Sequence, residues 1–441
     1  MLSAITFMAI PAKTYATDWR YFMMAITIFI VAIPVVKYYL PFFRRLKVTT
    51  AYEYLEKRFN YTTRMLASGI FIVFMVARTA LVLFLPSLAL TTVTGIDIYV
   101  CIVLMGIITI IYCTMGGVEA VIWGDVIQGF VLMVGAILAV VFLINGTEGG
   151  INKLIDVTID HNKMRTFNMA FSLTSATFWV VLFGGLANNL ISYSSDQTVI
   201  QRYLTTRDER SAGRSILMNG ILSIFVSLLF YFIGTALFAF YKTNPGQLNI
   251  AMGNPDSIFP HFIMTKMPAG IAGIMIAAIF AATMSTVSSS INSLSTAFTT
   301  DFYQYIFRNK PDKHLLKVAR ITGIILGGIG VGLAIMMAMW NILSLFDYFN
   351  YILGLLASGL GGLFFMGIFI PRIREKAAIA GFAGGFLTVL IVKLQTDIHL
   401  MLYGFIGMIS SIIIGLIFSY MFNEKDIALD GLTIKALNSE K

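Results

Sequence analysis

The residues best suited to chemistry are hydroxyl side chains in an otherwise apolar stretch, GIMIAAIFAATMSTVSSSINSLSTAF, residues 273–298. On a helix, two overlapping faces result: Ala282, Ser285, Thr286 and Ser289 share one, and Ser285, Ser288, Ser289 and Asn292 share the other. Hard cations take oxygen ligands, so hydroxyls with backbone carbonyls suit sodium, and two faces could serve two ions. The alternative is that these small residues pack helices while their hydroxyls bond to their own carbonyls.

Two ionisable residues lie within apolar runs, where such residues are rare and typically functional. Arg78 is midway along FIVFMVARTALVLFLP, where its planar guanidinium could hold an organic carboxylate through two hydrogen bonds. Its alternative roles are snorkelling to a headgroup or pairing with an acid. Asp125, in GGVEAVIWGDVIQGF, could complete one of the sodium sites; its alternative role is a helix-packing hydrogen bond.

The composition requires that these groups be held by membrane helices. Hydrophobic residues make up 58% of the 441 residues and charged residues only 12%, against about 25% in soluble domains. The net charge of +9 is explained by basic cytoplasmic loops and does not imply nucleic acid. Cys101 and Cys113 lie in one apolar run and suggest no disulfide framework, and four scattered histidines argue against a metal cluster.

Eleven apolar runs are long enough to span a bilayer: 19–42, 63–90, 97–115, 118–144, 174–194, 215–240, 269–292, 317–340, 346–370, 377–394 and 400–422. Basic segments such as FFRRLK, QRYLTTRDERSAGR and PRIREK fall on alternate connections, which predicts that these connections and the carboxyl tail are cytoplasmic. TTAYEYLEKRF is predicted to form a short surface helix. We expect one transmembrane domain, 1–422, followed by a cytoplasmic tail, 423–441. ITFMAIPAK and LFGGLANNLISYSSDQ contain residues that loosen helices, as in inverted-repeat transporters.

Several long phrases together resemble the sodium:solute symporter family, in particular its sialic acid (N-acetylneuraminate) branch. They are ITFMAIPAKTYATDW, TTAYEYLEKRF, GGVEAVIWGDVIQG, SSDQTVIQRYL and IAGIMIAAIFAATMSTVSSSINSLSTAFTTDFY. The resemblance runs along essentially the whole chain. It implies an all-α membrane protein of the LeuT type, with two inverted five-helix repeats, flanking helices and a site at the membrane midplane.

The resemblance also implies a set of site residues. The first sodium would meet backbone oxygens at Leu2 and Ala282 and the hydroxyls of Ser285 and Thr286. A second sodium would be held by Asp125, Ser285, Ser288 and Ser289. The sialate carboxylate would meet Arg78, with Ser3, Thr6 and Asn189 also contacting the substrate.

The sequence departs from the family pattern at two places. Ala25 stands where related sialic acid transporters have a glutamine, which could alter affinity or the preferred sialic acid. The family also begins with one further span and the first half of the broken core helix, whereas MLSAITF starts in mid-helix. We therefore expect a chain shortened at its amino end by roughly 40–60 residues, at about 20 residues per span.

The function implied is sodium-coupled import of sialic acid across a bacterial plasma membrane. Its only expected partners are this small molecule, the coupling sodium ions and lipid, with no nucleic acid and no obligate protein partner. A symporter of the same fold for proline, a sugar or another organic acid is the alternative, although Arg78 argues against neutral sugars. A sodium channel or sensor would use similar oxygen sites. A membrane enzyme would need a nucleophile with a base or a metal cluster, and neither is visible in the sequence.

Overall fold

The computed structural model describes residues 5–46, 48–248, 255–340, 344–422, 429 and 431–434; the side chains of 92–93, 115–122, 124–125 and 203 also lie outside the description. Its elements over the first part of the chain are η1 Ile5–Ala9, α1 Ile10–Ala16, η2 Trp19–Phe22, α2 Met23–Pro34, η3 Val35–Tyr39, α3 Leu40–Arg45, α4 Ala51–Arg58, α5 Tyr61–Thr94, α6 Ile98–Gly146 and α7 Gly150–Asp160. The remaining elements are α8 Phe178–Ser195, α9 Gln197–Thr205, α10 Glu209–Thr243, η4 Pro245–Gln247, η5 Pro255–Ser257, α11 Ile258–Lys266, α12 Ala269–Ala297, η6 Phe298–Tyr303, α13 Gln304–Ile306, α14 Asp312–Ala338, α15 Leu345–Ile352, η7 Leu353–Ala357, α16 Ser358–Phe369, α17 Glu375–Gln395, η8 Leu400–Leu402 and α18 Tyr403–Met421.

Nine helical segments of the described chain are long and apolar enough to cross a membrane. They correspond to nine of the eleven predicted spans. The predicted span 97–115 appears as a shorter apolar helix, Ile98–Thr114. The predicted span 174–194 is the helix α8, which falls outside the nine because two asparagines and several hydroxyls lower its hydropathy.

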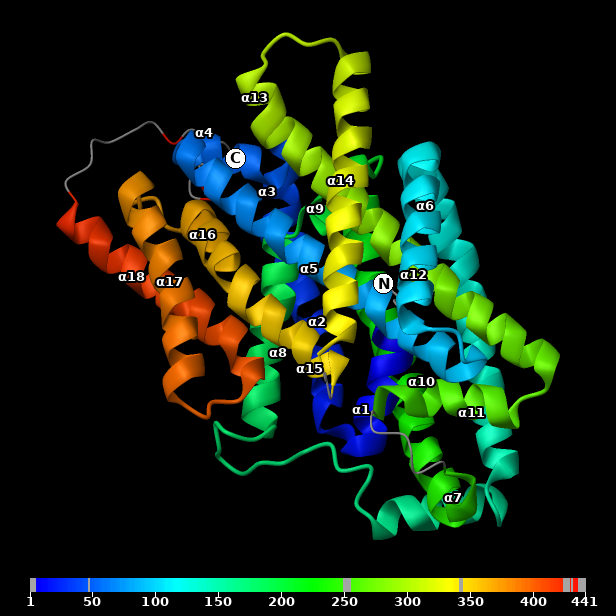
Figure 1. Cartoon of the computed structure of the whole chain (residues 1–441). Coiled ribbons are helices and arrows are strands. Elements are labelled where there is room, and N and C mark those ends of the chain that lie inside the picture. The colour runs from blue at the N-terminus through cyan, green and yellow to red at the C-terminus, as the bar shows by residue number, and fades with distance from the viewer. Residues whose placement is uncertain are drawn as a thin grey trace.

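The predicted spans 97–115 and 118–144 form one continuous helical element, α6. A straight helix of 49 residues would be about 74 Å long, more than twice the thickness of the hydrocarbon core. In Figure 1 this element instead rises to the top of the bundle and returns, so it supplies two arms.

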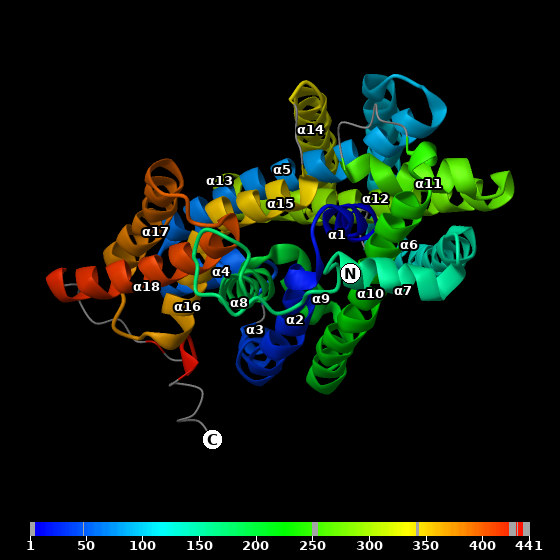
Figure 2. The ribbon, with the colours of Figure 1, turned by 90° about the horizontal axis from the view of Figure 1, so that it is seen from below.

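The helices form a central bundle with additional helices on one side. In the bundle α2 packs on α8 and α10, and α12 packs on both α5 and α6. The last two helices, α17 and α18, pack on each other and on α16, on the side of the bundle opposite α6 (Figures 1 and 2).

A break in the helix separates α8 from α9. Asp196 adopts an extended backbone (φ −79°, ψ 112°) between the two helices, and its side chain accepts a hydrogen bond from Thr198 N at 2.8 Å, which caps α9. The break lies within the segment LFGGLANNLISYSSDQ that the sequence singled out as a loosened helix.

The predicted short helix, α4, is anchored by its polar residues. Thr50 and Glu53 form a reciprocal capping box at its start. At its end the buried Arg58 donates to the carbonyls of Gly367, Ile370, Pro371 and Ile373, which lie at the end of α16 and just beyond it. A cation at the carboxyl end of a helix satisfies carbonyls that have no partner within the helix, so α4 is fixed to the bundle.

Candidate functional site

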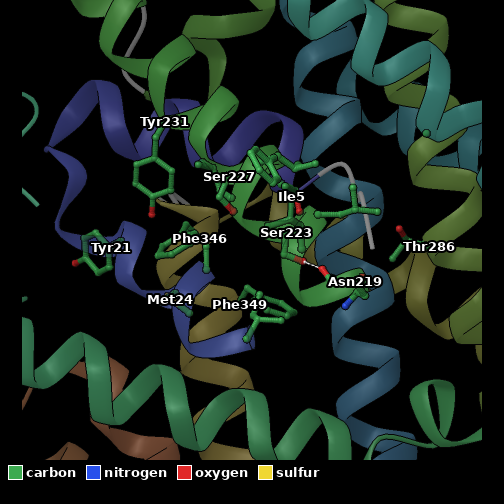
Figure 3. Close-up of a pocket in the computed structure, with 18 of the residues that line it drawn as sticks. Ile5, Tyr21, Met24, Asn219, Ser223, Ser227, Tyr231, Thr286, Phe346 and Phe349 are labelled. Atoms are coloured by element: carbon green, nitrogen blue, oxygen red, sulfur yellow. Dashed lines mark hydrogen bonds between the residues drawn. The ribbon is translucent and has the colours of Figure 1, made fainter. Parts of the chain in front are cut away.

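A cavity of about 630 Å³ lies between helices of the bundle. Its walls come from η1, α1, η2, α2, α5, α6, α10, α12 and α15, and Figure 3 shows the side chains that converge on it. Its volume falls within the range of small-molecule sites, about 300–1,000 Å³. Arg78 is the only charged side chain among the described residues that line it.

The sequence allowed Arg78 to bind an organic anion, to pair with an acid or to reach a lipid headgroup. Arg78 faces the cavity, and it also pairs with an acid, since its Nη1 lies 3.4 Å from Oδ2 of Asp196. That distance is long for a charge-assisted hydrogen bond. The Nε of Arg78 is buried and has no hydrogen-bond partner in the described chain. The guanidinium therefore keeps donor capacity beyond its contact with Asp196.

The serine-rich stretch forms α12, and its two predicted faces differ in their surroundings. Thr286 lines the cavity, and its hydroxyl donates to Ala282 O at 3.0 Å (Figure 3). Ser288, which is fully buried, donates to Ser285 O at 3.0 Å. The hydroxyls of Thr286 and Ser288 thus bond to carbonyls of their own helix, which was the alternative to a sodium site. These bonds use only the hydroxyl protons. The oxygen lone pairs of Thr286 and Ser288 stay available for a cation.

Two neighbours contact α12 at Ser288 of the second face and at Ser289, which belongs to both faces. Arg202 of α9 donates from Nη2 to Ser289 Oγ at 3.3 Å, so a positive charge borders this residue. Cys113 of α6 donates from Sγ to the carbonyl of Ser288 at 3.4 Å. The first arm of α6 is therefore in direct contact with the serine-rich helix.

The other predicted site residues are placed as follows. Thr6 and the departure position Ala25 both line the cavity. Asn189 lies against α2 instead, donating to Thr27 Oγ1 at 2.9 Å, and it is not among the described lining residues. Leu2, Ser3 and the side chain of Asp125 lie outside the described part of the chain.

The structure adds cavity residues that the sequence reasoning missed. Four polar side chains of α10 face the cavity at intervals of four residues, namely Asn219, Ser223, Ser227 and Tyr231. Asn350 of α15 also lines it. The four-residue spacing is visible in NGILSIFVSLLFY. The spacing alone did not predict a cavity lining, because hydroxyls in a long apolar helix often bond to their own backbone.

One rim of the cavity carries a charged cluster. Lys13 of α1 pairs with Asp347 of α15 at 2.6 Å, and the Oη of the cavity residue Tyr21 lies 3.3 Å from Nε2 of His399. Nearby, burial raises the pKa of Asp256 to about 6, against the effect of a hydrogen bond from Leu345 N. The cluster ties the short helix α1 to α15 beside the cavity.

Comparisons with known proteins agree with this architecture. The sequence profile described as "Sodium:solute symporter family" matches residues 1–385. The sodium/sialic acid symporter SiaT of Proteus mirabilis (strain HI4320) is 40% identical over 437 residues, covering 97% of this chain and 87% of the relative. NanT, a sodium/sialic acid symporter of Aliivibrio fischeri (strain ATCC 700601 / ES114), is 37% identical over 425 residues, covering 96% and 84%.

A solved structure gives the same picture. The substrate-bound outward-open state of a Na+-coupled sialic acid symporter, whose description includes a novel Na+ site, superposes with a TM-score of 0.89 at 38% identity, covering 96% of this chain and 88% of that one. The chain belongs to the sodium:solute symporter family. It is a multi-span, sodium-coupled membrane transporter with the LeuT-type fold, and it is not an enzyme.

Proposed function

We propose that this protein couples the entry of sodium to the import of sialic acid. One observation carries the proposal: among the described residues that line the cavity, Arg78 is the single charged side chain, and its Nε is buried without a hydrogen-bond partner in that part of the chain. A buried unpaired donor on a cation favours an anionic ligand, and a carboxylate matches the guanidinium geometry. The similarity to two sodium/sialic acid symporters supports sialate as that anion.

The sodium ions would bind along α12. The first would meet the backbone oxygens of Leu2 and Ala282 and the hydroxyls of Ser285 and Thr286, beside the cavity. The second would meet Asp125, Ser285, Ser288 and Ser289. Because Thr286 also lines the cavity, occupancy of the first position would stabilise the wall that the substrate contacts.

The substrate would be held from several sides. Arg78 would take the carboxylate, and Ser3 and Thr6 would contact the substrate from the first core helix. Asn189 would act less directly, by holding Thr27 and so the segment of α2 that carries Ala25. Sodium would bind first from outside and favour the substrate-ready state. Inward opening would then release both.

The proposed location is the bacterial plasma membrane, with the carboxyl terminus in the cytoplasm. Basic residues on alternate connections support this orientation. The contact between Tyr54 of α4 and Leu432 O, at 3.2 Å, supports a tail on the same side as α4. We also propose that transport needs no obligate protein partner, only lipid.

Uptake of labelled sialic acid into proteoliposomes tests the proposed function. An inward sodium gradient should drive accumulation, whereas an equal potassium gradient should not. Competition by unlabelled proline, neutral sugars and other organic acids then separates sialate from the other solutes of this fold. Sodium-driven uptake that another solute abolishes and sialic acid leaves unchanged would contradict the proposal.

A further inference from the structure

The polar side chains of α10 form a continuous row along the cavity. Asn219, Ser223, Ser227 and Tyr231 are four residues apart, so neighbouring members are displaced by only about 40° around the helix. The row extends for about 18 Å along the helix axis, at 1.5 Å per residue. Figure 3 shows these four side chains on the same stretch of helix, beside the cavity.

The two ends of this row differ in their hydrogen bonding. Asn219 donates to Tyr193 Oη at 2.9 Å, and Ser223 donates to the carbonyl of Asn219 at 2.6 Å. The hydroxyls of Ser227 and Tyr231 have no hydrogen-bond partner within the described chain. Ser227 thus differs from most hydroxyls on these helices, including Ser215 earlier on α10, which donates to Ser211 O at 3.0 Å.

These two hydroxyls face the cavity and not lipid. Ser227 is 9% exposed and Tyr231 only 5%, whereas the adjacent Leu228 is 45% exposed and turns outward. Rings of Trp19 and Phe22 pack against the Tyr231 ring, with centroids at 5.8 and 5.5 Å, and hold it in place. Figure 3 shows the Tyr231 and Ser227 oxygens directed into the same space as Phe346.

The cavity therefore combines an anion-binding group with separate neutral hydrogen-bonding groups. Arg78 accounts for a carboxylate. The hydroxyls of Ser227 and Tyr231 are each able to donate and accept, as the hydroxyls of a sugar are, and Phe346 and Phe349 offer apolar surfaces beside them. A small monocarboxylate would leave these groups without a protein or ligand partner, and a buried polar site discriminates against such ligands.

We propose that Ser227 and Tyr231 form a subsite for the hydroxyl-bearing body of a sugar acid whose carboxylate is held by Arg78. The inference rests on the proposed function and extends it by naming residues that select a polyhydroxylated anion. In this arrangement α10 contacts the neutral part of the ligand, and Arg78 of α5 binds its carboxylate.

The test measures sialic acid binding to the purified full chain at saturating sodium. Ser227→Ala and Tyr231→Phe each remove one oxygen and should weaken binding by about three- to tenfold, the range expected for one neutral hydrogen bond. Ser227→Thr, which keeps the hydroxyl, should bind sialic acid within about threefold of the parent. Ser215→Ala and Tyr241→Phe are matched controls on α10 outside the cavity lining, and they should leave affinity unchanged.

Sodium titration of each variant keeps the outcomes separate. Weakened sialic acid binding with unchanged sodium affinity supports the subsite and excludes a general loss of folding. Sialic acid affinity within twofold of the parent in the Ser227→Ala, Tyr231→Phe double variant would overturn the inference and leave the proposed function standing. A parent protein that binds sodium but no sialic acid would refute the proposed function itself, and the subsite with it.

Discussion

The substitution Arg78→Lys probes the substrate site most sharply, because it keeps the charge and removes the fork of donors. Arg78 contacts Asp196 through Nη1, and its buried Nε has no hydrogen-bond partner in the described chain. A lysine has one nitrogen on a flexible stem and cannot serve the acid and a ligand carboxylate with the same geometry. The variant should therefore lose at least one charge-assisted hydrogen bond to the substrate.

The expected loss is about 1.5–3 kcal/mol, the range for a hydrogen bond to a charged group, or roughly ten- to hundredfold in affinity. Equilibrium binding of labelled sialic acid at saturating sodium measures it, and sodium titration should give the parent value. Arg58→Lys is the matched control, because Arg58 is a buried arginine bonded to carbonyls outside the cavity. It should lower stability without changing affinity. Sialic acid binding and transport by Arg78→Lys within twofold of the parent would show that Arg78 is structural and refute the reasoning.

Three further predictions concern other parts of the molecule. Ser285→Ala, which removes an oxygen shared by both proposed sodium positions, should raise the sodium concentration for half-maximal sialic acid binding by tenfold or more; an unchanged sodium curve would contradict this. Asp301→Ala should lower the free energy of unfolding, measured by denaturant titration, by about 3–5 kcal/mol. It removes a fully buried acid that accepts hydrogen bonds from Thr50 and Ser68 and pairs with Arg64 at 2.6 Å, although Arg64 keeps its pair with Glu56. A loss below 1 kcal/mol would argue against the network. Burial raises the pKa of Asp256 to about 6 against about 3.9 unfolded, so the folded state binds the proton more tightly. Its contribution is full below pH 4 and falls by up to about 3 kcal/mol as the pH rises through 6. Asp256→Asn should remove that component from the pH dependence of thermal unfolding, and identical pH profiles would contradict the assignment.

The class of fold was predictable from the sequence because lipid leaves helices few alternatives. Long apolar runs must satisfy their backbone groups internally, and nine of the eleven predicted spans meet the length and hydropathy test in the structure. The overlapping faces of residues 282–292 also followed from helical periodicity alone, since spacing along one helix is a local property. The cost of a charge in a span marked Arg78 as a candidate site residue, but the sequence left open whether it would bind a ligand, pair with an acid or reach a headgroup.

What could not be predicted depends on contacts between distant segments. Asp196, 118 residues after Arg78, meets it only through the packing of the break after α8 against α5. Asn189 and the neighbouring Asn188 point to different helices, α2 and α18, which no local pattern distinguishes. The sequence does not distinguish Ser227 from hydroxyls that bond to their own helix, because the hydrogen-bond partner of a hydroxyl depends on which segment packs opposite it.

The most direct test of sodium coupling is the current that accompanies sialic acid uptake in proteoliposomes. Two sodium ions entering with one sialate carry net positive charge, and each charge gains about 2.3 kcal/mol per 100 mV of inside-negative potential. The proposed pair of sodium positions predicts an inward current when sialic acid is added in sodium, and none in potassium. Sodium-dependent uptake without current would contradict two coupled ions, and equal uptake in potassium would contradict the coupling itself.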